Sequence, residues 1–149
     1  MGWLWFTHST YFVRDAKHRE NIREYLLRGG FLFVEACIHP TANPDPDAYF
    51  VAETRSLQAI LPGLKITALP DRHDIFRAFF EIEGGPPHMY VNDGPRWMRY
   101  PLHMLIYQDR NVGLLSMSGL QCGILHGGSN LSDDCTRMFV NIYIYAMTH

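Results

Sequence analysis

The sequence predicts a single α/β domain, residues 1–149, whose sheet is dominated by parallel strands and flanked by helices. The first half of the chain alternates strand, helix, strand, helix and strand, which is typical of parallel βαβ units. Phe31–Val34 is apolar throughout, without the polar alternation of a half-exposed strand, as in strands buried on both faces of a parallel sheet. A length of 149 residues suits one domain with one core.

Local signals place the first three elements. Trp3–Thr7 is short, apolar and aromatic, which indicates a buried strand. Asp15 is expected to cap a helix that continues to Arg28. Gly29 and Gly30 end that helix, and one of them is expected in the left-handed conformation.

The next segment begins with a proline-rich loop. Three prolines between Cys37 and Asp47 exclude a regular element there. Asp47 is expected to cap a helix that continues to Leu61, followed by a strand over Leu64–Leu69. The apolar face expected for this helix consists of Phe50, Val51, Leu57, Ile60 and Leu61.

The second half of the chain predicts a hairpin and a last helix. The elements expected there are a short helix or turn over Asp71–Phe80, a long excursion over Glu83–Tyr100, two strands over Leu102–Gln108 and Val112–Met117, a glycine-rich loop over Ser118–Asn130, and a helix from Ser132 or Asp133 to Ala146.

Composition disfavours several classes of protein. Thirteen Lys and Arg against 15 Asp and Glu give a net charge of −2, which leaves no basic surplus for binding nucleic acid. No apolar run approaches the roughly 20 residues of a membrane span. Met1–Thr10 carries no basic stretch or cleavage site of a signal peptide. Three unpatterned cysteines predict no disulfide framework, so a cytoplasmic, reducing location is expected.

Several motifs resemble the bacterial family known as domain of unknown function 4159. Leu26-x-x-Gly-Gly-Phe-Leu-Phe33 and Leu69-Pro-x-x-His73 are moderately specific for that family, and Asn141-x-x-x-Tyr-Ala146 resembles its C-terminal motif. The resemblance spans nearly the whole chain and is weakest over Glu83–Arg99. It implies a fold like that of class I glutamine amidotransferases, of the flavodoxin-like type, and no established activity.

The chain departs from the family pattern in places that matter. The family's Thr-Gly-His-Gly element stands here as Thr7-His-Ser-Thr10, without its glycines. The acidic pair after the second strand is Glu35-Ala36, and Asp74 replaces a proline after His73. Family members usually carry a further strand-helix region before the strand that matches Trp3–Thr7, and we expect this chain to lack that region.

Polar residues follow the first three predicted strands. The carboxyl ends of parallel strands share one edge of a sheet, where α/β proteins bind their ligands. The sequence therefore predicts a ligand site lined by His8, Ser9, Glu35, Cys37, His39 and His73.

The chemistry of this predicted site stays open between three interpretations. The resemblance implies that Cys37 lies near the position of the amidotransferase nucleophile, but Glu35 and His39 stand where a nucleophile elbow needs glycines, which favours a structural cysteine. Glu35-x-Cys37-x-His39 offers zinc-type ligands, yet no recognised zinc spacing occurs, so we predict no metal and no cofactor. Histidines such as His8 and His73 more often bond to nearby backbone at loop ends.

Two functions follow as hypotheses. A non-catalytic binding or assembly module is favoured because no complete catalytic motif is present. The alternative is a hydrolase-like enzyme that uses Cys37 or a histidine-bound metal. A homo-oligomer is also expected, because the apolar strand Trp3–Thr7 would leave an open sheet edge, with Trp3 and Trp5 at the contact.

Overall fold

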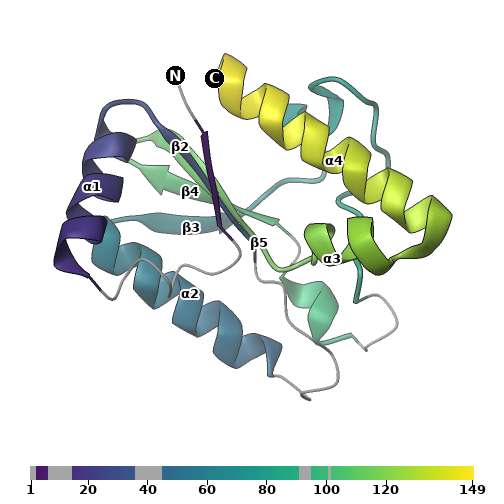
Figure 1. Cartoon of the computed structure of the whole chain (residues 1–149), viewed down its shortest axis with the longest axis horizontal. Coiled ribbons are helices and arrows are strands. Elements are labelled where there is room, and N and C mark those ends of the chain that lie inside the picture. Colours follow the sequence, from purple (N-terminus) through teal and green to yellow (C-terminus); the bar gives the residue numbers. More distant parts are fainter. Residues whose placement is uncertain (1–2, 7–14, 36–44, 91–94, 101) are drawn as a thin grey trace.

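The structure is a computed structural model that describes residues 3–6, 15–35, 45–90, 95–100 and 102–149, without the side chains of 3–6 and 97. Within these residues it has three layers, with one sheet between two layers of helices (Figure 1). The elements in chain order are β1 (Trp3–Phe6), α1 (Ala16–Leu27), β2 (Phe31–Glu35), α2 (Pro46–Ile60), β3 (Lys65–Ala68), η3 (Asp74–Arg77), η4 (Trp97–Arg99), β4 (Leu102–Tyr107), β5 (Arg110–Ser116), α3 (Leu120–His126) and α4 (Gly128–Thr148).

The sheet is mixed, so the prediction of a parallel-dominated sheet is wrong. Its five described strands lie in the order β1-β2-β5-β4-β3. β2 pairs in parallel with β1 and β5, whereas β4 pairs antiparallel with β5 and β3. The tight turn at Gln108 and Asp109, both with positive φ, returns the chain as a hairpin and inserts β4 between β5 and β3. β3 still runs in the same direction as β1, β2 and β5, but it does not pair with any of them.

Helices cover both faces of the sheet. On one face Leu26 of α1 and Leu57 of α2 pack on Leu32 of β2. On the other face α4 packs through Met138 on Phe33 of β2, together with α3 and η3. All five residues of β2 are buried, as the sequence predicted for a strand covered on both sides.

The start and end of α1 agree with the sequence prediction. The Asp15 side chain accepts a hydrogen bond from the Lys17 N–H at 2.7 Å, which caps the helix. Gly29 is the residue in the left-handed region, with φ +95°. Gly30 is needed for a different reason: a β-carbon there would collide with the ring of Tyr25.

The prediction for α2 is wrong in two details. Asp45, not Asp47, caps the helix, and Pro46 occupies its first turn. Val51 is 45% exposed although it was expected on the apolar face, and Glu53 is buried instead. The buried face of the helix therefore includes a carboxyl group.

The predicted loop over Ser118–Asn130 is wrong, because α3 forms within it and α4 begins at Gly128. The glycines that suggested a loop serve other purposes. Gly119 has φ +68° and packs against Tyr90 just before α3, and Gly123 lies inside α3 because the Cys135 thiol occupies the space of its β-carbon. Close helix packing, not flexibility, explains these glycines.

Candidate functional site

The structure describes two of the six predicted site residues. Glu35 and His73 are described, and the other four lie outside the described residues: His8, Ser9, Cys37 and His39. The predicted site as a whole therefore stays a prediction, and the two described members can be placed.

Glu35 ends β2 and is completely buried. Both of its carboxylate oxygens accept hydrogen bonds from the Gln121 N–H, at 3.1 and 3.0 Å, so the side chain caps the start of α3. Burial raises the pKa of Glu35 to about 7, and the backbone hydrogen bonds from Gln121 and Leu120 limit this rise.

The polar side chains near Glu35 are also buried, and the two serine hydroxyls among them lie within hydrogen-bond distance of each other. Ser116 pairs with Glu35 in the sheet register, and its hydroxyl lies 2.9 Å from that of Ser118. Burial and the charge of Glu35 raise the pKa of the Cys135 thiol to about 12, so the thiol is protonated and inert at neutral pH. This arrangement joins β2, β5 and α3 from within.

His73 lies elsewhere. Its Nδ1 accepts a hydrogen bond from the Ile75 N–H at 3.2 Å, and its ring lies 5.3 Å from the ring of Tyr145. Burial lowers the pKa of His73. Tyr145 in turn contacts the ring of Phe31, the first residue of β2, whereas Glu35 is the last. Four strand steps of about 3.3 Å place these ends about 13 Å apart, so the structure does not bring His73 to Glu35.

A polar clamp that the sequence did not predict joins α4 to the chain after η3. Asn141 is buried on α4, and its side-chain oxygen accepts hydrogen bonds from the backbone N–H groups of Phe79 and Phe80, at 3.2 and 2.7 Å. Its Nδ2 donates to the Phe80 carbonyl at 2.8 Å. The signal was present in the sequence: Asn141 stands beside Met138 and Ile142 in the apolar stripe of the helix, where a polar side chain needs a partner.

The clamp holds an exposed aromatic residue in place. Phe79 is 67% exposed although its backbone is fixed by Asn141. Its ring packs edge-on against Phe80 at 4.8 Å, and the guanidinium of Arg137 lies 5.7 Å from the Phe80 ring. An exposed aromatic side chain on an ordered backbone binds a partner with little loss of entropy.

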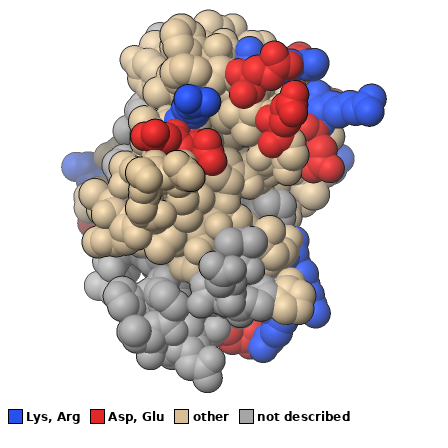
Figure 2. Space-filling model, turned by 90° about the vertical axis from the view of Figure 1, so that its right-hand side faces the viewer, with Lys and Arg blue, Asp and Glu red and all other residues tan. Residues whose placement is uncertain are grey.

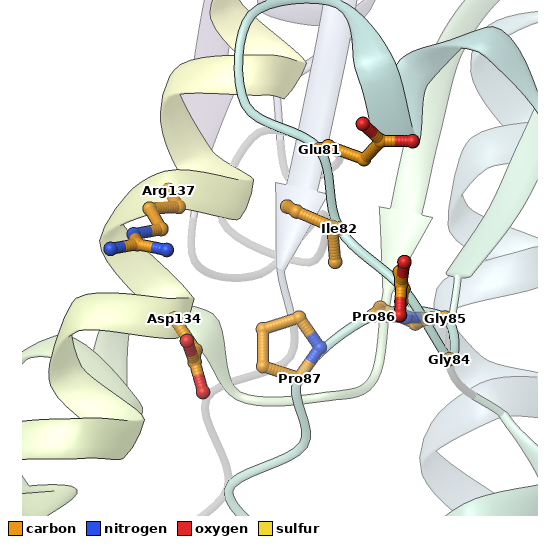
Figure 3. A pocket seen from close by; sticks show the side chains of 9 residues that line it. Glu81, Ile82, Gly84, Gly85, Pro86, Pro87, Asp134 and Arg137 are labelled. Atoms are coloured by element: carbon orange, nitrogen blue, oxygen red, sulfur yellow. The ribbon is translucent and has the colours of Figure 1, made fainter.

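A hollow of about 300 Å³ lies beside this clamp, between the segment 81–87 and α4 (Figure 3). Arg137 and Asp134 approach it from α4, and the segment 81–87 forms its other wall. Gly84 and Gly85, with φ +80° and +87°, allow that wall to turn. The residues that line the hollow are Glu81, Ile82, Glu83, Gly84, Gly85, Pro86, Pro87, Asp134 and Arg137.

Acidic groups predominate around this hollow. Its lining includes three acidic residues, Glu81, Glu83 and Asp134, and a single basic residue, Arg137. A second hollow of about 270 Å³ shares Glu81 and Glu83 and continues toward His73. Charged side chains also gather in the upper half of the molecule when it is seen from the right-hand side of Figure 1 (Figure 2).

Other observations bear on function. In the part of the chain that the structure describes, no helix is long and apolar enough to cross a membrane, and no group of three or more His, Cys, Asp or Glu could hold a metal ion. Cys122 is disulfide-bonded and its partner lies outside the described residues, whereas Cys135 is free. A disulfide at Cys122 was not expected from three unpatterned cysteines, so the cysteine pattern no longer supports a reducing, cytoplasmic location.

These features define an α/β domain with a mixed sheet, a closed polar core at the end of β2 and an open face beside α4. A family model described as "Domain of unknown function (DUF4159)" matches residues 2–147, so the chain belongs to that family. None of the curated proteins matches the chain. Two of the motifs that resemble the family contact each other in the structure. His73 of the Leu69–His73 motif lies against Tyr145 of the Asn141–Ala146 motif.

Proposed function

We propose that this domain is a non-catalytic binding module that holds a basic segment of a partner protein against Phe79 and the adjoining hollow. The fold proposed with it is the flavodoxin-like, class I glutamine amidotransferase-like type. The three-layer arrangement supports this fold, although the sheet is mixed.

The nature of the buried polar groups supports binding over catalysis. Glu35 is engaged by the backbone of α3, and the Cys135 thiol is buried and protonated. Cys122 is held in a disulfide. Each of these groups is buried or bonded within the fold, whereas a catalytic nucleophile or base needs access to its substrate.

The observation that carries the proposal is the exposed Phe79 on a backbone clamped by Asn141. Binding energy concentrates on ordered aromatic anchors that have pockets beside them. Here the adjoining hollow offers apolar surface from Ile82 and Pro87, and carboxylates from Glu81 and Glu83. A partner segment that alternates apolar and basic side chains complements this surface.

Peptide titration monitored by NMR tests the proposal. The probe is a hexapeptide of alternating leucine and arginine, compared with the same peptide carrying glutamate in place of arginine. We expect the arginine peptide alone to shift the amide signals of residues 79–87, and Phe79→Ser to weaken its binding on the order of tenfold. Leu27→Ser, which alters an exposed apolar residue on α1, is the matched control and should leave binding unchanged.

Equal binding of both peptides, or equal affinity of the Phe79→Ser and Leu27→Ser variants, would contradict the proposal. The enzyme hypothesis, with a site at His8, Ser9, Glu35, Cys37, His39 and His73, depends mainly on residues outside the described part. Stoichiometric zinc in the purified protein, or hydrolytic activity that the reduced protein shows and reduced Cys37→Ala lacks, would favour it over a binding module.

A further inference from the structure

Among the described strands, β1 lies at an edge of the sheet, and its four residues carry no charge. In the described part of the sheet it pairs with β2 alone, so its outer backbone groups face away from the sheet. Natural edge strands are usually guarded by charged residues, proline or a bulge. Residues 1–13 contain no Asp, Glu, Lys or Arg.

A second charge-free segment lies next to β1. The last 12 residues of the chain, Met138–His149, also contain no Asp, Glu, Lys or Arg, and they form the C-terminal half of α4. α4 contacts β1, and Figure 1 shows the C-terminal end of α4 near the start of β1. Two uncharged elements, far apart in sequence, therefore meet at one edge of the molecule.

The exposed residues of α4 extend this edge. Arg137 and Asn141 contact Phe80 on one flank of the helix. Phe139 contacts Phe33 of β2, at 5.7 Å between ring centroids. Tyr143 and Met147 follow Phe139 at successive four-residue steps, so the three residues form one row on the helix. Tyr143 is 45% exposed and Met147 is 38% exposed.

We propose that a second copy of this chain covers this edge, with β1 of each protomer paired antiparallel to β1 of the other about a two-fold axis. The two sheets then form one continuous sheet, and the row of Phe139, Tyr143 and Met147 from each α4 lies beside the new strand pair. A two-fold contact places the same surface on both sides, so any charged residue near its centre would face its own copy. The absence of charge from both segments suits contact with a second copy, whereas partners of a different kind are usually selected by complementary charge.

Sedimentation over a micromolar concentration range tests this inference. We expect the unmodified chain to form a dimer. Tyr143→Lys and Met147→Lys should each weaken dimerisation on the order of tenfold. Leu125→Lys on α3, at a residue 64% exposed, is the matched control and should remain dimeric. Phe79→Ser should also remain dimeric because Phe79 lies beside the other flank of α4, so this inference can fail or hold independently of the proposed function.

Hydrogen exchange of the unmodified chain gives a second measurement that requires no substitution. The amides of β1 should exchange more slowly as protein concentration rises, because pairing with a second β1 protects them. A chain that sediments as a monomer throughout, or a dimer whose β1 amides and Tyr143→Lys variant are both unaffected, would overturn the proposal.

Discussion

At the scale of single residues, Glu35 shows how a buried carboxylate can serve the fold. It is the last residue of β2, and its side chain caps the start of α3, which is far away in sequence. Burial raises the pKa of Glu35 and the backbone N–H groups of α3 lower it, and burial has the larger effect. The sequence identified Glu35 as a polar residue after a buried strand, but it could not reveal α3 as its partner.

The pKa of Glu35 makes stability depend on pH. Its value of about 7 in the folded chain lies above the ordinary 4.5, so the folded state binds this proton more tightly than the unfolded state. The resulting stabilisation is fully present below about pH 4.5 and is lost as pH rises through 7. Between pH 5 and pH 8 we expect the unmodified chain to lose on the order of 2 kcal/mol from this group.

Urea denaturation of Glu35→Gln at both pH values checks this prediction. The variant cannot ionise at this position, so its free energy of unfolding should fall less between pH 5 and pH 8 than that of the unmodified chain. Glu24→Gln, on the exposed side of α1, is the matched control and should retain the full dependence. An unchanged pH dependence in Glu35→Gln would show that Glu35 is not the group responsible.

At the scale of elements, the turn from α1 into β2 depends on two glycines for different reasons. Gly29 has positive φ and open space around it, whereas Gly30 lies against the ring of Tyr25. The Tyr25 hydroxyl accepts a hydrogen bond from the Phe31 N–H at 3.1 Å and donates to the Phe31 carbonyl at 3.2 Å. The ring therefore cannot move aside without losing both bonds.

We expect Gly30→Ala to cost roughly 2–3 kcal/mol through this collision, and Gly29→Ala about 1 kcal/mol through its positive φ. Thermal or urea unfolding of both variants shows which substitution costs more stability. A double-mutant cycle separates the causes: in a Tyr25→Ala background Gly30→Ala should cost much less, while the cost of Gly29→Ala should be unchanged. If Gly30→Ala costs the same in both backgrounds, the Tyr25 ring is not the obstacle.

The elements that the sequence predicted well are those with local signals. Asp15 and Gly29 mark the ends of α1, and both act within one turn of the helix. α3 was missed because its glycines are explained by distant contacts, such as that of Gly123 with Cys135. Asp45 and Asp47 are both acceptable caps for α2, and the proline between them decides in favour of Asp45.

At the scale of the whole molecule, strand order limited what the sequence could predict. The direction of β3 was foreseen, but its neighbour was not, because the β4–β5 hairpin inserts between β2 and β3. The predicted site assumed that His73 lies at the same edge as Glu35. Instead η3 packs against the C-terminal half of α4, so His73 contacts Tyr145. Distances of this kind depend on packing between elements, which no local pattern encodes.

The two proposed surfaces lie on opposite flanks of α4 and differ in character. The flank with Arg137 and Asn141 is charged and carries the clamped Phe79. The flank with Tyr143 and Met147 is uncharged, and α4 contacts β1. A dimer formed through the uncharged flank would leave both charged faces open, so each dimer would present two binding sites to its partners.

The disulfide at Cys122 is expected to stabilise the whole molecule. Cys122 lies next to Gln121, the residue capped by Glu35, so α3 is tied down both covalently and by hydrogen bonds. Reductant should lower the free energy of unfolding by roughly 2–4 kcal/mol. Cys122→Ser should lose the same free energy of unfolding without reductant, and reductant should lower it no further. Leu125→Ser, three residues along α3, is the control, and reductant should still lower its free energy of unfolding. Thiol titration of the denatured, non-reduced protein should detect the Cys135 thiol alone. Three reactive thiols, or stability indifferent to reductant, would contradict a stabilising disulfide at Cys122.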